Sequence, residues 1–346
     1  MEREEFKPSF ERIVGPNNKH KEAARKYLGE AVVESGELAP YEAAPSEAEL
    51  QIITWINAKV RDLVSSYGGK HRSLEPRQVH VLQSGSIQKI TGEPWKAFHD
   101  PLKQYIAVER RGSDVDFAIS VTHEWLHQTS YKAAQIKDED VELYRSGLVM
   151  VSRETDDDTA YFGQVEEAIV AELEQRFFER EMRANTLFER EVKASELMKE
   201  QLETLLKRNG YWNEALQKRL DDVYAIPGAE DVLARLAEKS RRSSGLDGRH
   251  TSEEDEYQIG FLMGALDRLE RERKLVWFTG REDRENLYRF LERIVENSGG
   301  KYRTSDEVFE EFAKANFSGN LLPLARMVEG ILGKGAFRRL GEEFRG

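Results

Sequence analysis

The chain has 346 residues, with 52 Lys and Arg against 64 Asp and Glu, a formal net charge of −12 and no cysteine. This length fits two domains, or one domain with a long appendage. The absence of cysteine excludes disulfides, a cysteine nucleophile, iron–sulfur clusters and thiolate zinc sites, so any metal site must use His, Asp and Glu. The acidic balance argues against nucleic-acid binding, which depends on clustered Lys and Arg.

Residues 1–45 are predicted to form a polar lead-in with one short helix over Lys21–Val33. The charged N-terminus lacks the apolar segment that a secretory signal requires. Elsewhere no uncharged apolar run approaches 18 residues, the length expected of a membrane-spanning helix. We therefore expect a cytoplasmic protein with no membrane association.

The next segment begins with a helix whose N-terminus carries a capping box, with Ser46 as the N-cap and Glu49 as its partner. Apolar residues then recur at helical spacing until Gly68–Gly69. Two extended runs, Val79–Leu82 and Gln104–Val108, predict strands joined by a glycine-containing loop. This part of the chain should therefore combine helix and sheet.

Two more helices are predicted around a further strand. An apolar-faced helix is expected over Val115–Gln128, a strand within Leu143–Ser152 and a second helix over residues 162–181. The second helix follows an acidic turn at Asp156–Asp158. A solvated turn is preferred to a calcium site as the interpretation of these aspartates.

From residue 186 onward the sequence predicts mainly helices, near residues 186–208, 212–222, 229–240, 251–274, 282–297, 305–316 and 320–340. Residues 241–249 are interpreted as a linker rather than as a phosphate-binding loop. Gly330–Gly335 has neither the spacing nor the Ser or Thr of a phosphate loop, so a glycine-rich helix terminus is preferred.

One motif carries chemistry. His123-Glu124-x-x-His127 lies inside the predicted helix Val115–Gln128. Imidazoles at positions i and i+4 point to the same face of a helix and can hold one metal ion. Glu124 can then act as a general base on a metal-bound water. The spacing therefore predicts a metal-dependent hydrolase. The alternative is a buried helix whose two histidines only form hydrogen bonds with their neighbours.

A hydrolytic zinc takes three protein ligands and keeps its fourth position for water. The extended motif with a third histidine fails here, because Ala133 stands at that position. The third ligand must come from elsewhere, and the helix over residues 162–181 offers the adjacent carboxylates Glu166 and Glu167. Either carboxylate could instead belong to a solvated helix face.

The motif, paired with the downstream helix that contains Glu167-Ala168-Ile169-x-x-Glu172-Leu173, resembles the zincin metallopeptidases of the gluzincin type, including uncharacterised bacterial members. The resemblance covers residues 46–185. It implies an α+β zincin-like domain with a short mixed sheet and two metal-binding helices. It also implies an edge strand that binds peptide above the cleft, for which Gln104–Val108 is the best match.

The same resemblance implies the site residues. Zn²⁺ would be held by His123, His127 and Glu167, with Glu124 as the general base in the hydrolysis of a peptide or protein substrate. Glu167 is preferred to Glu166, which stands where the family often has Asn.

Three tyrosines, Tyr131, Tyr144 and Tyr161, are candidates for stabilising the oxyanion, although a core position is the preferred interpretation of each. His80 and His99 lie in the predicted β region, where histidines satisfied by hydrogen bonds are preferred to extra metal ligands.

The predicted organisation has three parts: the lead-in, residues 1–45; the zincin-like metallopeptidase domain, residues 46–185; and an all-α C-terminal region, residues 186–346, that closes one side of the cleft or recruits a protein partner. Two alternatives to a metallopeptidase stay open. One is a zinc-binding regulatory protein without turnover, and the other is a helical interaction protein without metal.

Overall fold

The structure is a computed structural model that describes residues 10–31, 36–70, 75, 78–93, 95–110, 113–137, 140–152, 159–208, 210, 212–223 and 278–345. Four predicted features lie outside these residues: the helices at 229–240 and 251–274, the linker at 241–249 and the acidic turn at Asp156–Asp158. Within the described residues, no helix combines the length and the apolar composition that a membrane span requires.

The chain has an α+β fold and divides into two compact units. The first unit contains residues 1–110, 120–174 and 280–346, and the second contains residues 111–119 and 175–279. Both β-sheets belong to the first unit, together with the last four helices of the chain. The predicted C-terminal region, residues 186–346, is therefore divided between the two units.

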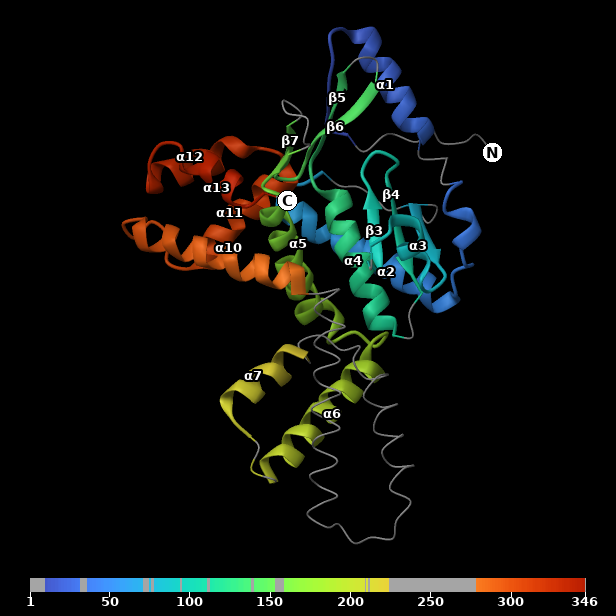
Figure 1. Cartoon of the computed structure of the whole chain (residues 1–346), viewed down its shortest axis with the longest axis vertical. Helices are drawn as coiled ribbons and strands as arrows, with labels where there is room; N and C mark the ends of the chain where they lie inside the picture. The colour runs from blue at the N-terminus through green and yellow to red at the C-terminus, as the bar shows by residue number, and fades with distance from the viewer. Residues whose placement is uncertain are drawn as a thin grey trace. The chain divides into compact units, whose positions relative to one another are not determined.

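The α-helices are labelled in Figure 1. Those of the first unit are α1 (Asn18–Ala31), the 3-10 helix η1 (Ala39–Tyr41), α2 (Glu47–Ser66), α3 (Ser86–Thr91), α10 (Phe278–Asn297), α11 (Ser305–Ser318), α12 (Leu321–Leu332) and α13 (Ala336–Glu343). Three helices contribute residues to both units: α4 (Asp114–Thr129), α5 (Gly163–Phe177) and α10, whose first two residues belong to the second unit. The second unit contains the π-helix η3 (Phe178–Met182), α6 (Glu189–Arg208) and α7 (Glu214–Val223).

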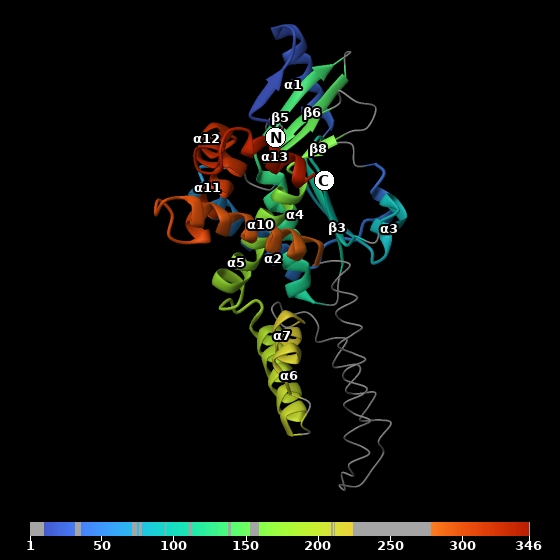
Figure 2. The same cartoon turned by 60° about the vertical axis from the view of Figure 1, so that its left-hand side comes forward.

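The larger sheet has five strands in the order β1-β5-β6-β7-β8. They are β1 (Arg12–Val14), β5 (Lys132–Lys137), β6 (Asp140–Ser146), β7 (Val149–Ser152) and β8 (Thr159–Tyr161). The β1–β5 pair is parallel and the other pairs are antiparallel, and α1 lies beside β1 and β5 (Figure 2). The single strand predicted within Leu143–Ser152 is wrong, because Gly147, with φ of +56°, turns the chain between two paired strands.

The smaller sheet has the order β2-β4-β3, with β2 (Val79–Leu82) parallel to β4 (Tyr105–Glu109) and β3 (Ala97–Asp100) antiparallel to it. The prediction of β2 is confirmed. The prediction that Gln104–Val108 forms an edge strand is wrong, because β4 is the middle strand and all five of its residues are buried. The edge strand next to it is β3, whose sequence lacks the alternation that marks a strand.

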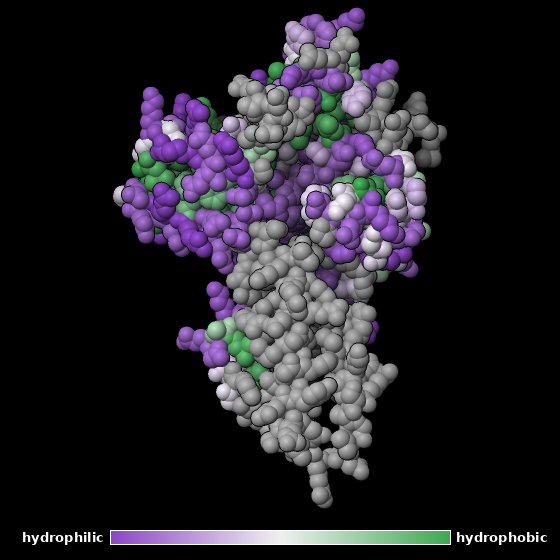
Figure 3. All heavy atoms as spheres, viewed as in Figure 1, coloured by the Kyte–Doolittle hydropathy of each residue, from purple (hydrophilic) through white to green (hydrophobic). Residues whose placement is uncertain are grey.

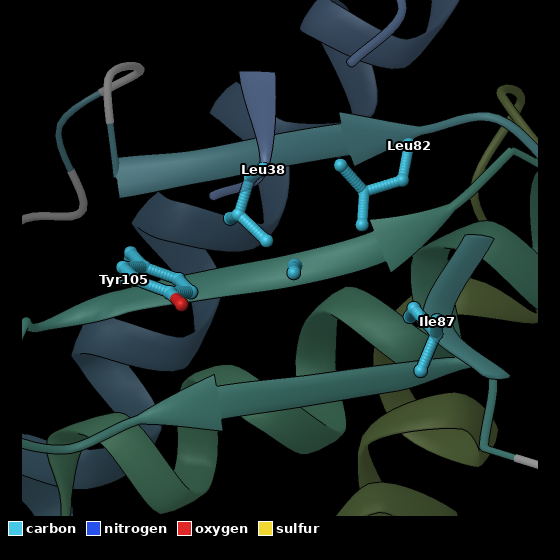
Figure 4. Close-up of a cluster of buried hydrophobic side chains, with 5 residues drawn as sticks. Leu38, Leu82, Ile87 and Tyr105 are labelled. Atoms are coloured by element: carbon cyan, nitrogen blue, oxygen red, sulfur yellow. The ribbon is translucent and has the colours of Figure 1, made fainter. Parts of the chain in front are cut away.

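A small apolar core covers this sheet and contains Leu38, Leu82, Ile87, Tyr105 and Ala107 (Figure 4). The predicted capping box that starts α2 is confirmed. Ser46 Oγ accepts a hydrogen bond of 3.2 Å from the backbone N–H of Glu49, whose carboxylate accepts one of 2.6 Å from the backbone N–H of Ser46.

Near the C-terminus the structure has two helices where the sequence predicts one. The helix predicted over residues 320–340 is interrupted between α12 and α13, where Gly333 and Gly335 have φ of +89° and +79°. On the face shown in Figure 3 the described side chains are mostly hydrophilic, and hydrophobic ones show over the C-terminal helices, where Leu322 is 55% exposed.

Phe162 precedes α5 and adopts φ of +65°, a conformation that a bulky side chain rarely accepts. Its ring is buried, lies 4.9 Å from the ring of Phe337 and fills the space where a Cβ on Gly341 would stand. Phe337 and Gly341 belong to α13, so the C-terminal helices help to fix where α5 begins.

Candidate metal centre

Two histidines one turn apart on α4 point to the same place. Nε2 of His123 lies 3.1 Å from Nε2 of His127. The helix follows the predicted bounds closely, with apolar neighbours such as Trp125 and Leu126 buried beneath it. Burial of these neighbours sets the rotation of α4, and the i and i+4 spacing then places both imidazoles on one face.

Glu167 of α5 completes a triangle of donor atoms. Its Oε1 lies 3.3 Å from Nε2 of His123, and its Oε2 lies 3.2 Å from Nε2 of His127. Zinc bound tetrahedrally at about 2.0–2.1 Å would hold its ligand atoms about 3.3 Å apart. The three side chains are therefore of the kinds that zinc takes as ligands, and each histidine nitrogen lies at about that spacing from the other and from one Glu167 oxygen. Among the described residues they form the one group of three His, Asp or Glu side chains whose ligand atoms, one from each residue, all lie within 4.8 Å of one another.

Each histidine is held from behind by a second carboxylate of α5. Nδ1 of His123 lies 2.8 Å from Oε2 of Glu174, and Nδ1 of His127 lies 2.8 Å from Oε2 of Glu166. A carboxylate at Nδ1 favours the tautomer that carries its proton there and leaves the lone pair of Nε2 for a metal ion. The structure thus puts Glu167 at the donor triangle and Glu166 behind His127.

Glu124, the predicted general base, is only 8% exposed and contacts a histidine from the smaller sheet. Its Oε2 lies 3.2 Å from Nδ1 of His99, on the edge strand β3. The His99 ring also stacks on that of His127, with centroids 5.0 Å apart and planes inclined by 7°. His99 is thus hydrogen-bonded, as expected for a strand histidine, and its partner is the predicted base.

These contacts determine the charge of each group in the metal-free protein. Burial raises the pKa of Glu124, but the hydrogen bond from His99 and the charges of the nearby histidines outweigh burial and lower it. Burial lowers the pKa of His127, but Glu166 and Glu167 outweigh burial and raise it to about 10. Glu124 is therefore ionised at neutral pH, and His127 carries a proton that a metal ion would displace.

The other candidate residues named from the sequence contact groups other than the proposed metal ligands. His80 pairs with Glu42 at 2.5 Å. The Arg145 guanidinium lies 4.7 Å above the ring of Tyr131, and Tyr144 is 42% exposed on β6. Tyr161 lies under the guanidinium of Arg345, at 5.2 Å. These contacts give no support to an oxyanion role for any of the three tyrosines.

Sequence reasoning did not name Glu174, and it named His99 only as a hydrogen-bonded strand histidine, without its partner Glu124. A signal for Glu174 was present, because a residue seven positions after Glu167 lies on the same face of a helix two turns on. No comparable signal exists for His99, since its position follows from the pairing of β3 with β4.

A scan of protein-family models returned no match to this chain, and searches of curated proteins and of solved structures returned none either.

Proposed function

We propose that the chain is a zinc-dependent metallopeptidase, a zincin-like hydrolase of the gluzincin type. One observation carries the proposal: Nε2 of His123 and Nε2 of His127 lie 3.1 Å apart, and each faces one carboxylate oxygen of Glu167, at 3.3 Å and 3.2 Å. The buried carboxylate of Glu124 follows His123 directly in the sequence and provides a base beside them. The proposed substrate is a peptide or protein, and the proposed location is the cytoplasm.

In the proposed reaction His123, His127 and Glu167 would hold Zn²⁺, which when bound supplies a Lewis acid and lowers the pKa of water. Glu124 accepts the proton of the attacking water and passes it to the leaving amine. His99 donates a hydrogen bond to Glu124 and keeps its carboxylate in one orientation.

Measurement of bound metal and of peptide hydrolysis tests this function. Purified protein should contain about one zinc per chain, and Glu124→Gln should retain it. Hydrolysis of a peptide library should fall by roughly 100-fold to 10,000-fold in this variant, because a positioned general base contributes about that factor. Glu285→Gln is the matched control, since Glu285 is an exposed carboxylate of α10 that forms an ion pair with Arg289.

The alternatives give different results. Bound zinc without hydrolysis by the unmodified chain would favour a regulatory zinc protein. A zinc content near zero that added zinc does not restore would remove both metal hypotheses and leave a helical interaction protein. Equal hydrolysis by Glu124→Gln and Glu285→Gln would contradict the assigned base.

A further inference from the structure

Asn316 of α11 is fully buried against the elements that follow the metal-binding helix. Its Nδ2 donates a hydrogen bond of 3.0 Å to Ser130 Oγ, and its Oδ1 accepts one of 2.9 Å from the backbone N–H of Leu148. Its backbone carbonyl accepts a hydrogen bond of 3.1 Å from the N–H of Tyr131. Every polar group of this side chain is directed toward the segment between α4 and β7.

Ser130 continues the contact toward the metal site. Its Oγ lies 3.3 Å from Oε1 of Glu166 and 3.0 Å from the carbonyl of Leu126. The Asn316 amide donates to Ser130 Oγ, so the Ser130 hydroxyl can donate its own proton either to Glu166 or to the carbonyl of Leu126. Oε1 of Glu166 in turn lies 2.9 Å from Nδ1 of His127. A buried chain of hydrogen-bonding groups thus runs from α11 to a proposed zinc ligand.

The position of Asn316 is fixed by close packing at the end of α11. Arg145 Nη1 donates a hydrogen bond of 2.7 Å to the carbonyl of Gly319, next to the last residue of the helix. A Cβ on Gly147 would lie only 2.1 Å from Oδ1 of Asn316, and Gly147 also has φ of +56°. Only glycine fits at this position, and the amide of Asn316 takes the space that a side chain would fill.

We propose that Asn316 is a positioning residue for the metal ligand His127, acting through Ser130 and Glu166. This inference rests on the zinc site of the proposed function. A carboxylate that holds a ligating histidine orients it well only when the carboxylate is itself held, and partners outside the ligands typically change metal affinity by about 10-fold to 100-fold. The C-terminal helix α11 thereby becomes part of the metal centre.

The test is the dissociation constant for zinc, measured by competition with a chromogenic chelator. Ser130→Ala removes the middle of the chain, and Asn316→Asp keeps the acceptor for Leu148 while removing the donor to Ser130. Each variant should weaken zinc binding roughly 10-fold. The double variant should bind zinc no more weakly than either single variant, because both substitutions interrupt the same chain of hydrogen bonds.

Phe312→Leu is the matched control. Phe312 is a fully buried residue of α11 that packs on Phe290, so the variant reduces the stability of the same helix without touching the hydrogen-bonded chain. Its zinc dissociation constant should stay within about twofold of the unmodified value. An equal weakening in Phe312→Leu and Ser130→Ala would overturn the proposal, as would unchanged affinity in folded Ser130→Ala and Asn316→Asp.

A second measurement needs no variant. If the chain couples His127 to α11, zinc should slow hydrogen exchange of the Leu148 and Tyr131 amides, which Asn316 binds. Unchanged exchange in protein that binds zinc would refute the positioning role and leave the proposed function intact. Failure of the unmodified chain to bind zinc would refute both.

Discussion

Two buried regions of the first unit differ in what fills them. Between α4 and α5 the interior is polar, and Nδ1 of both His123 and His127 faces a carboxylate. Among α10 to α13 the interior is apolar, as where the Phe290 and Phe312 rings meet edge to face at 6.3 Å. Burying charges costs free energy that their pairing only partly returns, whereas apolar burial stabilises directly. The first region is therefore suited to fix chemical groups, and the second to supply stability.

The sharpest way to test this contrast is to damage the apolar region. Phe312→Ala should lower the free energy of unfolding by about 4 kcal/mol, because it removes a ring from a fully buried position. Urea denaturation of the metal-free protein measures this change. The folded fraction should still bind zinc with unchanged affinity. A loss below about 1 kcal/mol would show that α11 contributes little to stability.

Damage to the polar region should affect metal binding instead. Glu167→Ala removes one of three proposed ligands, and if these share a zinc binding free energy on the order of 10 kcal/mol, the loss is about 3 kcal/mol, or roughly 150-fold in affinity. Glu166→Gln should weaken binding by only about 10-fold to 100-fold, since Glu166 acts behind His127. Chelator competition compares the two. A larger effect from Glu166→Gln would reverse the assignment of ligand and supporting carboxylate.

The hydrogen bond from His99 to Glu124 tests whether the polar region also orders the base. His99→Ala should raise the activation free energy by about 2 kcal/mol and so lower kcat roughly 30-fold, because a hydrogen bond to a charged group typically contributes about 1.5–3 kcal/mol. Zinc content should not change, and His99→Asn, which offers an amide donor, should recover part of the rate. Loss of zinc from His99→Ala would mean instead that the ring supports His127 by stacking.

The parts of the fold that the sequence could predict are those that depend on local spacing. The predicted helix Val115–Gln128 differs from α4 by one residue at each end, and the capping box at Ser46 is present as expected. Both signals lie within a few residues of chain. The same holds for His123 and His127, whose spacing lies within α4, whereas Glu167 of α5 was preferred to Glu166 only by the family resemblance.

What the sequence could not predict depends on contacts between distant segments. The β3 segment shows no alternation, and only its pairing with β4 brings His99 to Glu124. Asn316 and Ser130 are 186 residues apart, and no local pattern links them. The prediction of an edge strand at Gln104–Val108 was wrong for the same reason, because position within a sheet is set by its neighbours.

Asp283 is a carboxylate of α10 whose pKa responds to the charge of Glu167 in the polar region. Burial, with the charges of Glu167 and Glu282, raises its pKa from 3.8 to about 6. Because its pKa is higher in the folded protein than in the unfolded chain, ionisation destabilises the fold, and this cost appears as the pH rises from about 4 through 6. Asp283→Asn should therefore stabilise the metal-free protein above pH 7 and leave it unchanged below pH 4.

The expected gain is about 1 kcal/mol, since solvent screens a half-exposed side chain. Urea denaturation at the two pH values measures it, with Glu285→Gln on the same helix as the control that should show no such pH dependence. An equal gain at both pH values would point to packing rather than charge. Zinc should reduce the gain further, because its binding would neutralise the Glu167 carboxylate that repels Asp283. The smallest predicted effect, that of Asp283→Asn, and the largest predicted loss of zinc affinity, that of Glu167→Ala, thus both depend on the Glu167 carboxylate.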